Sequence, residues 1–381
     1  MIYFDQAATS FPKPKAVLDA MADYFYNIGG NVGRSAHQHA LGASEIVFNT
    51  RELLAELFKV RDSSRIVFTK NVTESLNAAI YGFLANGGRV LTTVAEHNSV
   101  MRPLRDLEQT GRIELTLIPA NAAGVPDLPG LEALLRRREY HLAVINHASN
   151  VTGLVAPVAP ITALCRQYGC KVLVDAAQTA GVYPIDVAAS GIDLLAFTGH
   201  KSLLGPQGTG GLYVDPRVNL PPLLRGGTGS NSAAETQPDF FPDQFEAGTL
   251  NIIGLAGLGA GVKYILDTGL EEIAATERRL TAAFLRGIRD NPAIEVYGGA
   301  DAEQRVAVVS FNIKKRSPSE TAYLLDKDYG IACRSGLHCS PSTHRFLGTL
   351  PEGAVRFSFG CFNTLAEVAQ GVEAVNALTE A

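Results

Sequence analysis

A lysine in a short polar and glycine-rich segment is the residue of this sequence best suited to covalent chemistry. Lys201 follows the apolar run Leu194 to Phe197, within Thr-Gly-His-Lys-Ser and ahead of Gly-Pro-Gln-Gly-Thr-Gly-Gly. An amine at a strand end can form a Schiff base with a carbonyl cofactor, and small neighbours let the cofactor approach the backbone. A buried ammonium is costly unless it is neutralised or used chemically. We therefore expect a Schiff-base lysine rather than an exposed surface lysine.

An acidic residue ends another apolar run, Val172 to Val174, upstream of this lysine. Asp175 could cap the helix that follows, or it could keep a pyridine nitrogen protonated, which makes the ring a stronger electron sink. Gln178 could reach an oxygen of the same ring, because its spacing permits both side chains to share one face of the turn. Lys201 and Asp175 together indicate pyridoxal 5'-phosphate as the cofactor.

A phosphate group needs backbone donors at the start of a helix. The segment Thr69 to Ser75 follows one apolar run and precedes a helical pattern, which makes Thr73 a candidate phosphate ligand. Thr198 and His200 would supply further donors. An ordinary capped helix is the alternative, since threonine and serine are good caps. The sequence contains no Gly-x-x-x-x-Gly-Lys-Ser/Thr motif, which argues against a nucleotide P-loop.

Three more polar residues follow or interrupt apolar runs. His97 could lie flat on an aromatic ring and move protons, or it could be a packed structural histidine. Asn150 could bond to a ligand oxygen. Arg356 lies inside an apolar strand, where its charge demands an anion: either a substrate carboxylate or an internal ion-pair partner.

Three of the five cysteines can be interpreted from their surroundings, whereas Cys361 is ambiguous. Cys339 lies in a loop of small residues that ends in proline, which suits an exposed, reactive thiol near basic groups. Cys165 and Cys170 flank a helix-to-strand turn and are typical of packing residues. Five cysteines without a framework spacing favour a reducing compartment, and their pattern predicts no metal site.

The elements that must position these residues alternate between helical and strand patterns through the first two thirds of the chain. Short apolar runs predict strands near 66–68, 90–91, 115–118, 142–145, 172–174, 194–197 and 211–214, with helical patterns between most of them. This alternation predicts an α/β fold with a mainly parallel sheet, where ligands sit beyond the carboxyl ends of the strands. We expect a large cofactor-binding domain at residues 12–254 and a smaller α+β domain formed by residues 1–11 and 255–381.

Composition excludes several classes of protein. A net charge of −5 over 381 residues lacks the basic face that nucleic-acid binding requires. The sequence shows no signal-peptide pattern and no long uncharged apolar run, so we expect a cytoplasmic protein without a membrane span.

Taken together, these motifs resemble the class V, fold-type I pyridoxal-phosphate enzymes, and most closely the cysteine desulfurase and selenocysteine lyase family. The resemblance covers nearly the whole chain. It rests on Tyr3 to Thr9, Asn31 to His37, Thr73-Glu74, Glu96-His97, Val174 to Gln178, Gly199 to Lys201, Phe245 to Thr249 and Arg334 to Pro341. The last segment is similar to the short cysteine loop of the group II desulfurases.

The resemblance implies a role for each of these positions. Lys201 would hold the cofactor and move the α-proton, Asp175 would pair with the pyridine nitrogen, Gln178 would meet the ring oxygen, and His97 would stack on the ring. Thr73, Thr198 and His200 would hold the phosphate, with Thr249 reaching it from the partner subunit of a homodimer. Arg356, with Asn150 and Arg334, would bind the carboxylate side of the substrate. Cys339 would take the sulfur of L-cysteine as a persulfide, release L-alanine and pass the sulfur to an acceptor protein.

Two positions depart from the family pattern. Gly33 stands where relatives often have a histidine near the substrate, and Leu337 replaces the first histidine of a common His-His-Cys loop. Both departures remove candidate acids or bases. Alternative activities on the same scaffold are therefore selenocysteine lyase or cysteine C–S lyase chemistry by β-elimination, and a catalytically silent scaffold is a third reading.

Overall fold

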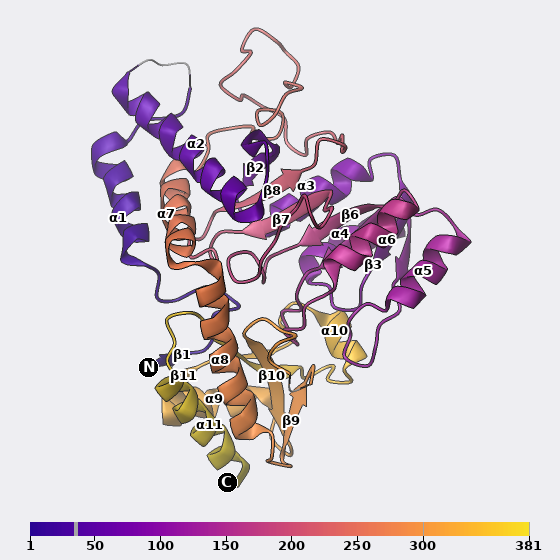
Figure 1. Cartoon of the computed structure of the whole chain (residues 1–381), viewed down its shortest axis with the longest axis vertical. Coiled ribbons are helices and arrows are strands. Elements are labelled where there is room, and N and C mark those ends of the chain that lie inside the picture. The colour runs from indigo at the N-terminus through magenta and orange to yellow at the C-terminus, as the bar shows by residue number, and fades with distance from the viewer. Residues whose placement is uncertain (34–36, 300, 381) are drawn as a thin grey trace.

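The computed structural model describes residues 1–33, 37–299 and 301–380 (Figure 1). Residues 34–36 of the motif Asn31 to His37 lie outside this description, whereas Gly33 lies within it. A seven-stranded sheet forms the centre, in the order β2-β8-β7-β6-β5-β3-β4. Its strands are β2 (Ile66–Thr69), β3 (Gly88–Thr92), β4 (Ile113–Leu117), β5 (Leu142–Asn146), β6 (Lys171–Asp175), β7 (Leu194–Thr198) and β8 (Gly210–Val214).

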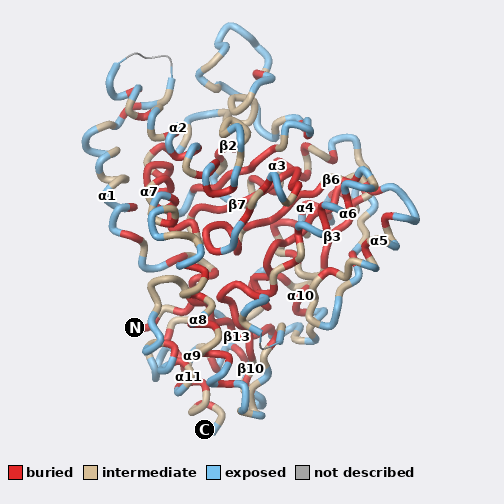
Figure 2. The backbone as a smooth tube through the Cα atoms, in the orientation of Figure 1, coloured by how far each residue is buried: buried red, intermediate tan, exposed pale blue. Residues whose placement is uncertain are grey.

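The sheet is mainly parallel, as predicted. Strands β7, β6, β5, β3 and β4 pair in parallel, and only β8 runs antiparallel to both of its neighbours. Since parallel strands need crossover connections, helices cover both faces and the strands are buried on both sides. Along β5, Ala143 and Ile145 face one core, whereas Leu142 and Val144 face the other. Figure 2 shows these strands as the buried centre of the molecule.

Helices on the two faces of the sheet belong to separate cores. On one face lie α3 (Val72–Phe83) and α4 (Asn98–Gln109). On the other lie α2 (Gln38–Phe58), α5 (Leu128–Arg137), α6 (Val158–Gln167) and α7 (Ile252–Thr268), with α1 (Lys15–Asp23) packed on α7. A π-helical turn, Tyr24–Ile28, follows α1, and a 3-10 turn, Ser63–Arg65, leads into β2. The buried Cys165 and Cys170 contribute to the core of this second face, as packing residues should.

The remaining elements form a smaller unit with its own core. Four antiparallel strands are ordered β12-β13-β10-β9: β9 (Ile294–Tyr297), β10 (Val308–Ile313), β12 (Arg334–Gly336) and β13 (Ala354–Ser358). They pack with α8 (Leu270–Ile288), α9 (Pro318–Tyr329) and α11 (Leu365–Glu380), while α10 (Pro341–Phe346) lies beside the larger unit. The amino terminus belongs here too, because β1 (Ile2–Tyr3) pairs with β11 (Ile331–Ala332) and Phe4 is buried in this core.

The division of the chain into 12–254 and 1–11 with 255–381 stays a prediction. Helix α7 contributes Leu255, Leu258 and Val262 to the core of the large sheet, and so does Ile273 near the start of α8. The carboxyl-terminal part of the small core starts at Leu280, further along α8. This packing favours a division after α7 rather than before it. Within the described part of the chain, no helix is both long and apolar enough to cross a membrane.

Candidate active site

The carboxyl ends of the parallel strands open into a cavity of about 290 Å³. Its lining combines the ends of β5, β6 and β7 with the first residues of α3 and α4. The lining residues are Asn71, Val72, Thr73, His97, Ser99, Asn146, Asn150, Asp175, Ala177, Gln178, Thr198, His200 and Lys201. The parallel sheet therefore brings together eight of the residues that the sequence analysis named, although they are spread over 129 positions of the chain from Thr73 to Lys201.

Lys201 and Asp175 both line this cavity. Burial lowers the pKa of the lysine to about 8, with the positive charges of Arg356 and Arg334 acting in the same direction and Asp175 and Cys339 opposing it. Burial also raises the pKa of Asp175, while a 2.9 Å hydrogen bond from the Ala177 amide and the nearby lysine lower it. The cavity thus contains both a lysine amine that loses its proton readily and the carboxyl group of Asp175.

His97 begins helix α4 at the wall of the cavity. Its Nδ1 accepts a 3.0 Å hydrogen bond from the Ser99 amide, which caps the helix and leaves Nε2 as the protonated nitrogen of the neutral ring. Burial, followed by the charges of Lys201, Arg102 and Arg356, lowers the pKa of His97 to about 4. The ring is therefore neutral at physiological pH, as suits a flat surface for an aromatic ligand.

The amino end of helix α3 points its first residues into the same cavity. Asn71 caps the helix by accepting a 3.0 Å hydrogen bond from the Glu74 amide, and the Thr73 hydroxyl lies 2.8 Å from the Ser99 hydroxyl. The free amides of a first helical turn favour an anion. The segment is a capped helix whose start also lines the cavity, and its role as a phosphate site stays a prediction.

Thr198, His200 and Gln178 complete the polar lining of the cavity. The Thr198 hydroxyl makes only a 3.5 Å contact with the Thr209 carbonyl oxygen. His200 Nδ1 is buried and has no hydrogen-bond partner within the described residues, and burial lowers its pKa to about 4. Gln178 donates to the Ala7 carbonyl oxygen at 3.1 Å.

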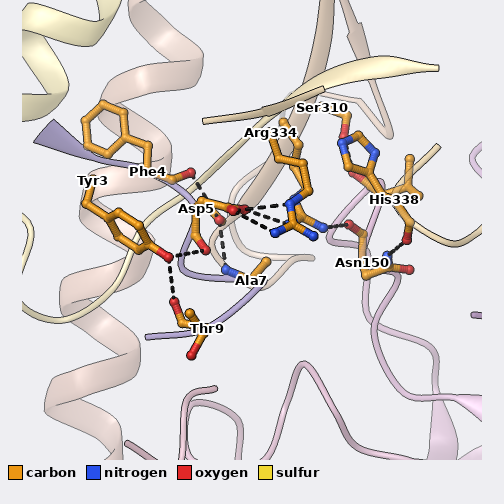
Figure 3. A network of polar contacts seen from close by, with 12 residues as sticks. Tyr3, Phe4, Asp5, Ala7, Thr9, Asn150, Ser310, Arg334 and His338 are labelled. Carbon is orange, nitrogen blue, oxygen red and sulfur yellow. Dashed lines mark hydrogen bonds and ion pairs between the residues drawn. The ribbon is translucent and has the colours of Figure 1, made fainter. Parts of the chain in front are cut away.

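The predicted substrate-binding residues form a network next to the cavity (Figure 3). Arg356 is 2% exposed, and its Nη1 donates to the main-chain oxygen of Asn150 at 3.1 Å. Arg356 also forms an ion pair with Asp5, at 2.9 Å, so the internal partner weighed above is present. Arg334 joins the same carboxylate at 3.1 Å. The structure thus brings all three predicted residues together and adds Asp5 between the two guanidinium groups.

The loop of Cys339 lies over the turn that carries His97. Its main-chain oxygen accepts a 2.8 Å hydrogen bond from the Asn98 amide, and the thiol is exposed. His338 and Cys339 both adopt left-handed backbone conformations, with φ of 49° and 55°. Such torsions cost energy in non-glycine residues and persist where the surroundings hold them, often at functional sites. Asn150 contributes to that hold, since its Nδ2 donates to the His338 carbonyl oxygen at 2.6 Å.

Thr249 is the one predicted cofactor ligand that lies elsewhere. It is exposed and lines a different cavity, together with Lys70, Glu74 and Phe245. Within one chain it does not line the lysine cavity. Its assignment concerns a pocket completed by a second subunit, and it stays a prediction.

The residues present fit pyridoxal phosphate. The cavity lining includes an amine, a carboxylate and a helix start, which match the aldehyde, the ring nitrogen and the phosphate of that molecule. Three buried polar atoms beside the cavity also lack partners in the described part of the chain: Asn150 Oδ1, His200 Nδ1 and Arg356 Nε. Since buried polar groups are normally hydrogen-bonded, unsatisfied groups of this kind point to a bound ligand.

Sequence reasoning missed Asp5, Asn71, Ser99 and Asn146 as members of the site. Ser99 and Asn146 could have been found from their places just beyond strand-like runs, as His97 and Asn150 were. Asp5 carries no comparable signal, because its partners Arg334 and Arg356 are more than 300 positions away.

The fold and the site are those of one class of protein, and comparison with known proteins identifies that class. The family model for class V aminotransferases matches residues 2–370, so this chain belongs to that family. Among curated relatives, a probable cysteine desulfurase of Pyrococcus abyssi is 35% identical over 97% of this chain and 92% of its own length. A cysteine desulfurase of Salmonella dublin is 34% identical over 97% of this chain and 91% of its own length.

Solved structures agree with the sequence relatives. The apo structure of cysteine desulfurase from Thermococcus onnurineus superimposes with a TM-score of 0.92 at 33% identity and covers 100% of this chain and 94% of that one. The cysteine desulfurase CsdA of Escherichia coli gives a TM-score of 0.88 at 30% identity, over 99% of this chain and 94% of that one. The predicted fold and the resemblance are thereby confirmed.

Proposed function

We propose that this protein is a pyridoxal-phosphate-dependent cysteine desulfurase that converts L-cysteine to L-alanine and keeps the sulfur as a persulfide on Cys339. One observation carries the proposal: Lys201 and Asp175 line one cavity, and the exposed Cys339 lies on a loop that is hydrogen-bonded to the turn carrying His97 of that cavity. The similarity to cysteine desulfurases along the whole chain supports the choice of substrate.

Different residues of the cavity lining would each hold one part of the cofactor. Lys201 would bind the aldehyde carbon, Asp175 the ring nitrogen, and Gln178 the ring oxygen. The phosphate would lie against Thr73, Thr198 and His200, and His97 would cover the ring face. When bound, pyridoxal phosphate supplies an electron sink that eases bond cleavage at the α-carbon of an amino acid.

Lys201 is suited to move a proton once its amine is free. A lysine pKa near 8 lies close to physiological pH, so Nζ can both accept the α-proton and return it. Arg356 would orient the substrate through its carboxylate, because its Nε is buried and lacks a partner among the residues described. Asn150 Oδ1 would accept a hydrogen bond from the same substrate.

Cys339 would attack the substrate sulfur as a thiolate. A sulfur–sulfur bond forms as the carbon–sulfur bond breaks, and the electron pair of the broken bond leaves with the carbon fragment. Protonation of that carbon yields alanine, so atoms and electrons balance without an external oxidant or reductant. The persulfide on an exposed loop is accessible to an acceptor protein.

We further propose that the working unit is a homodimer. Thr249 is exposed and does not line the lysine cavity of its own chain, so we infer that its predicted bond to phosphate is made in a second subunit. Light scattering should give the mass of a dimer. A monomer with full activity would contradict this part of the proposal.

A Cys339→Ser variant tests the reaction and separates it from the alternatives. We expect alanine formation from cysteine to collapse and mass spectrometry to find a persulfide on Cys339 of the wild-type protein only. Sustained turnover of cysteine to pyruvate in the variant would instead indicate C–S lyase chemistry by β-elimination. Selenocysteine turnover can survive in the variant because selenium leaves more readily, so the wild type decides: turnover of selenocysteine without alanine formation from cysteine would identify a selenocysteine lyase. A protein that stays colourless with added cofactor would indicate a silent scaffold.

A further inference from the structure

The two arginines of the candidate carboxylate site are direct neighbours across two antiparallel strands. Arg334 on β12 pairs in register with Arg356 on β13. Like charges that lie directly opposite each other in a sheet repel and destabilise the pair. Two guanidinium groups in this register therefore need an anion between them. If the substrate carboxylate were the only such anion, the enzyme without substrate would have none.

Asp5 is that anion. Its Oδ1 accepts from Arg356 Nη2 at 2.9 Å, and its Oδ2 lies 3.1 Å from Arg334 Nη2 and 3.2 Å from Arg334 Nε (Figure 3). The carboxylate is largely buried, with 14% of its side chain exposed, so the surrounding protein screens it less than water would. Hydrogen bonds on both sides of Asp5 fix its place beside β13. The Phe4 main-chain oxygen accepts from the Ser358 amide, and the Ala7 amide donates to the Ser358 hydroxyl.

Asp5 leaves part of the Arg356 guanidinium without a hydrogen-bond partner. Arg356 uses Nη2 on Asp5 and Nη1 on the Asn150 oxygen, while its buried Nε has no partner in the described chain. Arg356 therefore keeps one hydrogen-bond donor that Asp5 does not use. Two arginines and one aspartate give the group a net charge of one positive unit, which complements a single carboxylate.

We propose that Asp5 is a specificity-determining residue that tunes this site to monoanionic carboxylates and disfavours dianions. This inference rests on the proposed function, in which the site takes the carboxylate of an amino acid. Asp5 acts in two ways: it holds Arg334 beside Arg356, and it cancels one of their charges. A ligand with a second negative charge would lie near Asp5 without a further cation to pair with.

Binding of two simple anions to the cofactor-loaded enzyme tests the proposal. Acetate and malonate carry the same headgroup, but malonate has a second carboxylate, and both can be titrated against the absorbance of the bound cofactor. We expect Asp5→Asn to shift the affinity ratio toward malonate by about tenfold, the order expected for one partly screened unit charge. Asp5→Glu keeps the charge, so its ratio should stay near that of the wild type even if both affinities change.

Arg334→Gln provides a test in the opposite direction and does not depend on the folding of an Asp5 variant. Removing this cation leaves the group neutral, so the ratio should shift toward acetate. An unchanged ratio in either Asp5→Asn or Arg334→Gln would overturn the proposal. The measurement needs no turnover, so a wild-type enzyme that forms no persulfide on Cys339 would refute the proposed reaction and leave this result standing.

Discussion

The hydroxyl of Ser340 donates a 2.7 Å hydrogen bond to the main-chain oxygen of Glu96, across 244 positions of the chain. This bond joins the loop that carries Cys339 to the turn that carries His97. The Asn98 amide reinforces the contact by donating to the Cys339 oxygen at 2.8 Å. Cys339 is therefore tied to a turn that helps to line the lysine cavity, although it lies on an exposed loop.

Removing the Ser340 hydroxyl should misplace the thiol without emptying the cavity. We expect Ser340→Ala to slow persulfide formation roughly tenfold to a hundredfold, because small displacements of reacting groups are costly. Cofactor absorbance should be unchanged. Ser342→Ala is a matched control, since the Ser342 hydroxyl approaches the same Glu96 oxygen at only 3.5 Å. Equal effects of the two substitutions would show that the Ser340 bond has no special part in positioning Cys339.

Lys201 should be identifiable by trapping and by its titration. Borohydride reduction of the cofactor-loaded protein followed by peptide mapping should label Lys201, and Lys201→Arg should lower kcat at least about a hundredfold because it removes the proton-transfer group. A label on another lysine would contradict the whole interpretation.

The rate at which the cofactor-free protein takes up pyridoxal phosphate should depend on pH. Only the neutral amine attacks an aldehyde, and burial lowers the pKa of Lys201 from 10.5 to about 8. Uptake followed by absorbance should therefore rise with pH and level off above about 8. A rate that continues to climb beyond pH 10 would show that the amine behaves as an ordinary surface lysine.

Arg356 and Arg334 should differ in their effect on substrate affinity. Arg356 has 3% of its side chain exposed, whereas Arg334 has 48%. Charged hydrogen bonds that are buried contribute more than exposed ones, so Arg356→Gln should raise KM for cysteine about tenfold to a hundredfold and Arg334→Gln less than about fivefold. Steady-state kinetics with both variants would check this order, and a larger effect of Arg334→Gln would contradict it.

Glu277 should make the stability of the fold depend on pH. It is buried on α8 at the boundary with the large sheet domain, and burial raises its pKa to about 8. The native state therefore keeps a proton that the unfolded state releases above about pH 4.5, so unfolding becomes easier as pH rises toward 8. Glu277→Gln cannot ionise, and its melting temperature relative to wild type should increase between pH 5 and 8. The exposed Glu271 on the same helix serves as a control, because Glu271→Gln should show no such trend.

Much of the fold followed from local pattern alone. Alternating apolar runs and helical spacings predict the order of elements because burial on a sheet or a helix face imposes a period on the chain. The strand-end residues Lys201, Asp175 and Thr198 were predictable for a related reason: parallel strands bring their carboxyl ends to one edge. The class of protein likewise followed from short segments such as Gly199 to Lys201.

Contacts between distant segments were decided only by the tertiary structure. Asp5 meets Arg356 because β1 and the residues after it lie beside the small sheet, and Ser340 meets Glu96 because the start of α10 lies against the turn after β3. Such pairings depend on how separate cores pack together, which leaves no periodic trace in the residues themselves. The sequence alone determined which chemical groups are present and on which strand ends they lie. Packing decided which charges those groups face.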